Sequence, residues 1–465
     1  MGTKPKFALL MLLAVLGIAA GGGTAHADGT PAGTDVQVAQ TLGARELTVI
    51  IRRVDVTPSP LRVDVVTHQG SPPGTLHLAV AADGVTSART DVVLGAEPGV
   101  YAGNLQVDKP GPWELSLSDG IGPAATIPFI VPARVVPPWE KATYGGFVAA
   151  GVFLLLALVV GLKARRTAFA LVPAGGAVAA IAVAVTGALL SASTPPPPAP
   201  GSQLDPTFDN VTDPYANAQL STVDYSRPPV NLAAHSEPGG LKLDFTDGAT
   251  GRPVDDLLIH DNALVHLVLV SPSGRMSHLH PVRVGPGDYR VRVADPEAGT
   301  YAVAAELVRR GGGVQLVRST VDLAGTAAPA PEPPGAGPQT VDGTPVDLTV
   351  TPGTPTTVTA HFRTQDLQPW LGMLGHLIIA GPISGPVGES AAKAPTWAHV
   401  HAIIPPVAGQ LDRPDETVAA YGPDVSFTYT FAAPGRYRIW LQAERGYRVL
   451  TIPAVVDVPT TGAGR

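Results

Sequence analysis

Two uncharged apolar stretches, only four residues apart, constrain the fold of this 465-residue chain more than any other feature. The first stretch runs from Tyr144 to Leu162 and the second from Thr167 to Ser193. A helix of about 19 residues is about 28 Å long and can cross the hydrocarbon of a bilayer. The alternative, two buried helices of a soluble domain, fits less well because uncharged spans of this length are costly to solvate. The sequence therefore predicts a two-helix transmembrane hairpin over 144–193.

The charges around the hairpin predict on which side of the membrane each part of the chain lies. The link Lys163-Ala-Arg-Arg166 carries three cations, and cytoplasmic connections are enriched in Lys and Arg. Residues 1–27 contain two lysines, an apolar run and an Ala-His-Ala ending, which is typical of a cleaved signal peptide rather than an uncleaved anchor helix. We therefore expect a cell-membrane protein whose N-terminal and C-terminal domains lie on the extracytoplasmic side.

Composition excludes several classes of protein. With 38 acidic and 31 basic residues the formal net charge is -7, so we expect no nucleic-acid partner. The chain has no cysteine, which excludes disulfides and thiolate metal sites and leaves His, Asp, Glu and Met as metal ligands. Its 49 prolines and 52 glycines favour many turns and strand ends over long helices.

Short runs of β-branched residues, separated by Gly and Pro, cover most of the chain outside the hairpin. Alternation of apolar and polar residues, as in Trp113-Glu-Leu-Ser-Leu117, predicts a mainly β fold built from sandwiches. We expect three sandwiches and two linkers. The sandwiches are expected at 45–135, 229–325 and 343–460, and the linkers at 194–228, which is Pro-rich, and at 326–342.

The second and third of these regions repeat each other. Ser277-His-Leu-His-Pro281 matches Ala398-His-Val-His-Ala402. A later strand also matches, from Ala298 to Glu306 in one region and from Pro434 to Gln442 in the other. The first region shares only this last element, so the repeated His-x-His motifs belong to the second and third regions.

The repeat carries the candidate metal ligands. Residues i and i+2 of a strand point to one face, so His278 and His280 are expected to be neighbours. A hairpin centred on Ser273 places His266 opposite His280, and opposed residues share a face. His260 lies just before the strand of His266 and could supply a fourth nitrogen. The second region is therefore predicted to hold a metal site of three or four imidazoles.

The third region repeats this trio as His376, His399 and His401. Trp370 stands where His260 would align, so this site has three histidines at most. A long loop at 381–397 separates its strands, and sequence spacing does not fix their register. The two regions together predict two metal sites, one in each region.

Clustered imidazoles favour a metal site because protonated rings would repel one another. Neutral imidazole is a ligand for Cu(II), Zn and Ni, so the ligand type leaves copper, zinc and nickel as candidates. A structural explanation stays open, in which the histidines pin turns and the chain is an interaction or scaffold module. The sequence contains no P-loop, dinucleotide fingerprint, HExxH motif or nucleophile elbow, so we expect no enzymatic activity.

The stretches His260–Val270 and His278-Leu-His-Pro281, and their counterparts around His376 and His399, resemble the YtkA-like family of bacterial secreted domains. The first region, with Pro110-Gly-Pro-Trp113, is similar to FixH/CopC-like relatives. The resemblance implies Ig-like sandwiches and an association with extracytoplasmic metal handling, often of copper. We therefore expect a copper-binding envelope protein, whose role would be to capture, buffer or deliver the metal to an envelope protein partner. The chain departs from the pattern in the third region, where Ala402 follows the His-x-His motif in place of Pro. The CopC type of copper site is not matched either, because Asp28, not His, begins the mature chain.

Overall fold

The computed structural model describes residues 35–52, 54, 56–131, 138–164, 166–193, 227–404 and 414–460. The predicted signal peptide at 1–27 and most of the predicted linker at 194–228 lie outside these residues. The chain divides into two compact units. Among the described residues, one unit contains the two long apolar helices and the other contains the strands, so the fold is mainly β as predicted.

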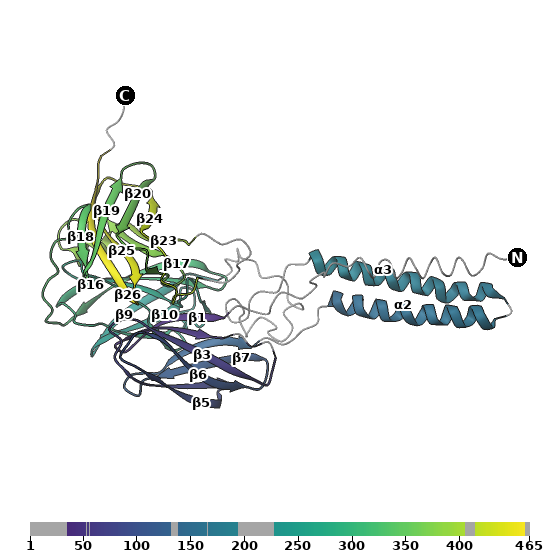
Figure 1. Ribbon diagram of the computed structural model, residues 1–465. Coiled ribbons are helices and arrows are strands. Elements are labelled where there is room, and N and C mark those ends of the chain that lie inside the picture. The colour runs from purple at the N-terminus through teal and green to yellow at the C-terminus, as the bar shows by residue number, and fades with distance from the viewer. Residues whose placement is uncertain are drawn as a thin grey trace, which may run out of the picture. The chain divides into compact units, whose positions relative to one another are not determined.

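The first unit contains α2 (Pro138–Lys163) and α3 (Leu171–Ser193), connected through a 3-10 turn at Thr167–Ala170. The two helices lie side by side in Figure 1. Both are long and apolar enough to cross a membrane, with mean hydropathies of 2.5 and 2.2. Only 11% of the most apolar stretch of each helix is buried. The predicted hairpin at 144–193 is thus present, and its first helix begins six residues earlier, at Pro138.

Small residues bring the two helices together. A Cβ placed on Gly146 would lie 2.9 Å from the Cβ of Ala184, and one placed on Gly187 would lie 2.6 Å from the carbonyl oxygen of Trp139. These contacts pair the start of α2 with the end of α3, so the helices are antiparallel. Glycine and alanine at such contacts let helix backbones approach closely where no hydrophobic effect drives their association.

The second unit contains, within its described residues, six sheets that form three sandwiches, each around a hydrophobic core. The sheets of the first sandwich have the strand orders β1-β2-β3-β6 and β5-β4-β7-β8. The first domain was predicted at 45–135, but the structure adds β1, which pairs with β2 before that boundary. The strands are β1 (Val36–Leu42), β2 (Arg45–Ile51), β3 (Ser59–Thr67), β4 (Gly74–Ala82), β5 (Val85–Leu94), β6 (Gly99–Val107), β7 (Gly111–Ser118) and β8 (Ala125–Val131).

The second sandwich combines the sheet β14-β15-β10-β9 with a sheet in which β13, β12 and β16 are neighbours, β11 pairs with β16, and β17 pairs with β16. The strands are β9 (Val230–Glu237), β10 (Gly240–Asp247), β11 (Leu257–Leu258), β12 (His266–Val270), β13 (Met276–Leu279), β14 (Val282–Gly285), β15 (Asp288–Arg292), β16 (Gly299–Arg309) and β17 (Gly313–Leu323).

The third sandwich combines the sheet β18-β19-β20-β24 with a sheet in which β23, β22 and β25 are neighbours, and β21 and β26 each pair with β25. The strands are β18 (Gly337–Val341), β19 (Thr344–Thr351), β20 (Thr356–Phe362), β21 (Leu367–Gln368), β22 (Gly375–Gly381), β23 (Thr396–Ala402), β24 (Asp424–Tyr429), β25 (Gly435–Arg445) and β26 (Arg448–Val458). A short helix, α4 (Val387–Lys393), connects β22 to β23.

The strand order repeats between sandwiches. The sheet β13-β12-β16-β17 of the second sandwich corresponds to β23-β22-β25-β26 of the third, and to β5-β4-β7-β8 of the first. The remaining sheets of the first and third sandwiches, β1-β2-β3-β6 and β18-β19-β20-β24, also share one order. The common order agrees with the internal repeat seen in the sequence and extends it to the first sandwich.

A separate hydrophobic core joins the second and third sandwiches. Val268 and Val270 of β12 lie in it together with Ile378 of β22 and Trp440 of β25. On β12 the alternate residues, such as Leu269, belong to the core of the second sandwich instead. Both faces of β12 are therefore covered, one by the core of the second sandwich and the other by the core shared with the third sandwich. This explains why all five residues of β12 are buried.

Candidate metal centre

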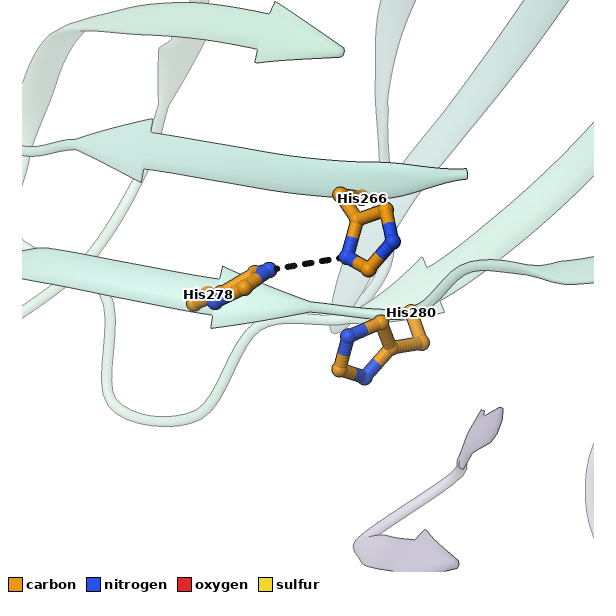
Figure 2. Close-up of side chains that lie close together, drawn as sticks. All are labelled: His266, His278 and His280. Carbon is orange, nitrogen blue, oxygen red and sulfur yellow. Dashed lines mark hydrogen bonds between the residues drawn. The ribbon is translucent and has the colours of Figure 1, made fainter. Parts of the chain in front are cut away.

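His266, His278 and His280 come together in the second sandwich, and we call them the first trio. β12 pairs with β13 in the register Leu267↔Leu279, which places His266 opposite His280 as the sequence predicts. All three rings are buried, and one nitrogen of each ring lies within 4.8 Å of the others. Figure 2 shows His266 facing His278 of the neighbouring strand and His280, which lies just beyond the end of that strand.

Each ring of the first trio has an oxygen at the nitrogen that points away from the other two rings. His266 Nε2 lies 3.0 Å from the backbone oxygen of His260, His278 Nδ1 lies 3.0 Å from Oε1 of Gln442, and His280 Nδ1 lies 2.6 Å from Oε1 of Glu46. These oxygens accept hydrogen bonds, so the outer nitrogens carry the ring protons. The inner nitrogen of each neutral ring is then left with a lone pair.

The inner nitrogens of the first trio face one another. Nδ1 of His266 lies 3.3 Å from Nε2 of His278, the contact drawn in Figure 2. Nε2 of His280 is buried without a hydrogen-bond partner among the described residues. Two lone pairs at such a distance repel each other, and a metal ion bound to the inner nitrogens would remove the repulsion. The outer oxygens are placed as in metal sites where an acceptor orients each histidine ligand.

His376, His399 and His401 repeat this arrangement in the third sandwich, and we call them the second trio. β22 pairs with β23 in the register His376↔His401, which is the register of the first hairpin although α4 lies in the connection. His376 Nδ1 lies 3.0 Å from His399 Nε2, and His401 Nε2 lies 3.2 Å from the same atom. The second trio thus also directs three nitrogens to one place.

The outer nitrogens of the second trio face oxygens as well. His376 Nε2 donates to the backbone oxygen of Trp370 at 3.1 Å. His401 Nδ1 lies 3.4 Å from Oδ2 of Asp261, and His399 Nδ1 lies 3.6 Å from Oε2 of Glu306. The last distance is too long for a good hydrogen bond, but it places a carboxylate beside the ring. All six histidines therefore share one orientation, with an oxygen outside and imidazole nitrogens inside.

The two trios form one continuous cluster. The ring of His399 lies 5.3 Å from that of His266 and 5.1 Å from that of His278, and His278 lies 5.6 Å from His376. Ring distances within the trios are similar, for example 5.5 Å between His266 and His278. The sequence predicts one site in each region, but the structure brings them together because both trios lie on the sheet faces that pack against each other. Val268 and Ile378, the register partners of His278 and His399, belong to that shared core.

His260 does not join the first trio. Its backbone oxygen accepts from His266, while its ring nitrogen lies 3.0 Å from Oδ2 of Asp261 and 3.9 Å from Oε1 of Glu306. Asp261 and Asn262 have positive φ angles of 44° and 61°, so the chain turns sharply here and carries the ring to the outer side. The ring of His260 therefore forms a group with the two carboxylates near the second trio, and the expected fourth ligand of the first trio is replaced by a backbone contact.

Burial keeps most of these rings neutral. It lowers the pKa well below the ordinary imidazole value, and neighbouring rings lower it further, for His266, His278, His376 and His399. Neutral imidazole is the form that binds metal ions. Burial and the nearby Asp261 raise the pKa of the Glu306 carboxyl to about 7. Burial alone would raise the pKa of Glu46, but the contacts with His280 and Thr41 outweigh burial and lower that pKa.

The oxygen groups around the rings were not predicted as site residues. Glu306 and Gln442 end the two matched strand segments, and their equivalent places in the repeat are a signal that could have identified them. Asp261 follows His260 directly in the sequence. Glu46 belongs to the first sandwich, 234 positions before its partner His280, and nothing in the sequence pattern connects them.

A family model that describes a domain of unknown function (DUF8832) matches residues 339–460, which include every described strand of the third sandwich from β19 onward. No curated protein matches the sequence. The family match covers one sandwich of the chain and carries no activity with it.

Several solved structures are similar to the chain at low identity. A tetra-tandem repeat from the extending region of a large adhesion protein is 13% identical with a TM-score of 0.16, covering 91% of this chain and 74% of that one. A Salmonella alpha-2-macroglobulin mutant is 12% identical with a TM-score of 0.20, covering 90% of this chain and 24% of that one. Latent PorU from Porphyromonas gingivalis is 9% identical with a TM-score of 0.14, covering 91% and 33%. Scores this low transfer neither fold nor function to this chain.

Proposed function

We propose that this chain is a membrane-anchored metal-binding protein of the bacterial cell envelope, and that its metal is copper. The observation that carries the proposal is the common orientation of the six imidazoles, whose outer nitrogens face oxygens while their inner nitrogens face one another. Packing alone does not require lone pairs to be directed at lone pairs. A cation held by each trio accounts for both halves of the arrangement.

Two considerations favour copper over zinc: imidazole nitrogen is a suitable ligand for copper, and copper generally has the higher affinity for such ligands. Divalent copper binds nitrogen sites more tightly than zinc does. Three imidazoles also suit zinc, which would keep a fourth position open. The resemblance to YtkA-like and FixH/CopC-like domains adds support for copper and for Ig-like sandwiches. With no catalytic motif in the sequence, we propose capture, buffering or delivery of the metal to an envelope protein partner rather than catalysis.

The proposed location follows from the hairpin α2–α3 and the cations between its helices. Lys163 ends α2, and the link to the next helix continues with Arg165 and Arg166. Cytoplasmic placement of this link puts the β unit on the extracytoplasmic side. Protease added to intact cells would then digest the sandwiches, whereas resistance until the membrane is opened would reverse the assignment.

Copper titration of the full chain in detergent tests the proposal, after removal of bound metal with a chelator. The full chain is needed because Glu46 of the first sandwich contacts His280. We expect about two copper ions per chain, one for each trio. The double variant His278→Ala/His280→Ala should lose one of them, because it removes two of the three inner nitrogens of the first trio.

Matched control variants are available in the same chain. His77 and His361 are exposed, and each pairs with an aspartate at 2.8 Å. His77→Ala and His361→Ala should bind the same amount of copper as the wild-type chain. If the wild-type chain and the double variant take up equal, negligible amounts of copper, the proposal is wrong.

A scaffold role is the second candidate, and one observation favours it. The six rings lie where the second and third sandwiches meet, and His280 also contacts the first sandwich. Histidines in such a place can serve as interface packing. Capture of an envelope protein that is unaffected by a chelator and by His278→Ala/His280→Ala would favour the scaffold over the metal-binding protein.

A further inference from the structure

The two trios have the same kind of ligand but different neighbours. The strand register places Glu306 of β16 and Gln442 of β25 at equivalent positions, each opposite the first histidine of its own sandwich. Each contacts the trio of the other sandwich: Gln442 accepts from His278, and Glu306 faces His399. A neutral amide therefore stands at the first trio where a carboxylate stands at the second.

More carboxylates face ring nitrogens at the second trio than at the first. Glu46 faces the first trio, 2.6 Å from His280. Asp261 and Glu306 face the second trio, at 3.4 Å and 3.6 Å from ring nitrogens. The other outer nitrogens face neutral oxygens in both trios, those of two backbone carbonyls and of Gln442. The described contacts thus give one carboxylate to the first trio and two to the second.

The charged groups farther from the rings do not alter this difference in the number of carboxylates. Glu444 pairs with His68 at 2.6 Å, and because the pKa of His68 is about 9 the pair has no net charge at pH 7. The nearby Glu416 accepts a hydrogen bond from the backbone N–H of Leu371 and, among the described contacts, faces no ring nitrogen of either trio. On the other side the ring of His260 lies 3.0 Å from Oδ2 of Asp261 and belongs to neither trio.

An ion bound by either trio brings its charge into a largely buried place with only neutral ligands. A buried charge is stable when opposite charges nearby compensate it. One carboxylate compensates a single positive charge, and two compensate a double one. Building on the proposed function, we infer that the first trio holds copper as Cu(I), whereas the second trio holds a divalent ion, Cu(II) or Zn(II). For copper, the second trio then has the lower reduction potential.

The test uses the full chain in detergent and two variants that each keep one trio. His278→Ala leaves the second trio complete, and His399→Ala leaves the first. Each variant is loaded with copper and titrated potentiometrically while the electron paramagnetic resonance signal of Cu(II) is recorded. We expect the ratio of Cu(II) to Cu(I) affinity to be at least tenfold higher at the second trio, equivalent to about 59 mV for a one-electron couple.

Two substitutions that exchange the amide and the carboxylate test whether these groups cause the difference in reduction potential between the trios. In the chain that keeps the second trio, Glu306→Gln should raise the potential; in the chain that keeps the first trio, Gln442→Glu should lower it. Equal potentials, or the reverse order, with one copper ion bound to each variant overturn the inference and leave the proposed function intact. A wild-type chain that binds no copper overturns the proposed function, and the inference with it.

Discussion

At the scale of single residues, the six clustered histidines differ from the exposed ones in what surrounds the ring. His77 and His361 each have a carboxylate at one nitrogen, and about half of each side chain is exposed (57% and 44%). His266 and His376 instead donate to backbone oxygens, which fixes the rings and leaves their Nδ1 atoms for other partners. A backbone acceptor in a fixed turn holds a ring more rigidly than a mobile side chain does, which suits a site of defined geometry.

His68 has a different role, since it joins the first and third sandwiches. Its Nδ1 lies 2.6 Å from Oε1 of Glu444, and both side chains are buried. Burial alone would lower the pKa of His68, but the carboxylate of Glu444 outweighs burial and raises that pKa to about 9. Because the pKa is higher in the folded chain than in the unfolded one, the protonated ring stabilises the fold fully below about pH 6.5. This stabilisation is lost as the pH rises through about 9.

His68→Gln should therefore lower the free energy of unfolding at pH 7, by an amount on the order of 3 kcal/mol, and by much less at pH 10. The measurement compares the urea midpoints of the variant and the wild-type chain in detergent at both pH values. The exposed variant His77→Gln serves as the control and should shift neither midpoint. An equal deficit for His68→Gln at pH 7 and pH 10 would show that the ring is not protonated in the folded chain.

At the scale of elements, the sequence predicts the strand register where the turn is short. The turn between β12 and β13 is centred on Ser273, and the observed pairing Val268↔His278 agrees with it. The hairpin β22–β23 has the same register, but its connection contains α4, and no alternation pattern shows how such an insertion closes. The apolar run of β12 also indicates burial on both faces, but it does not identify the sheet that covers the second face.

A substitution at Trp440 of β25 tests whether the packing between the second and third sandwiches holds the candidate metal site in place. Its side chain is 1% exposed in the core between the second and third sandwiches, and its indole nitrogen donates to the backbone oxygen of Gly274 at 3.2 Å. Trp440→Ala should lower the free energy of unfolding by about 3–5 kcal/mol. It should also weaken copper binding, because Gln442, two residues further along the strand, contacts His278.

Val85 is 70% exposed on β5, and Val85→Ala is the matched control that should change neither quantity appreciably. Urea denaturation and copper titration are performed on the same preparations. A destabilised Trp440→Ala chain that still binds copper with wild-type affinity would separate the packing of the sandwiches from the geometry of the site.

At the scale of the whole molecule, the candidate site draws on all three sandwiches. The second and third sandwiches supply the rings, and the first supplies Glu46. The sequence predicts the mainly β fold, the apolar hairpin and both histidine trios, because these depend on local pattern and on an internal repeat. It does not predict that the trios adjoin, because contacts between sandwiches join residues far apart in the chain, such as His278 and Gln442, by packing rather than by periodicity.

X-ray absorption spectroscopy at the copper edge of the loaded full chain tests the central claim most directly. The inner nitrogens of each trio should give about three nitrogen donors per copper ion at about 2 Å, with the outer scattering typical of imidazole rings. The same spectrum should lose imidazole scattering in the His278→Ala/His280→Ala variant. A copper shell without imidazole scattering, or one that is unchanged in that variant, would contradict the claim that the two histidine trios are the metal ligands.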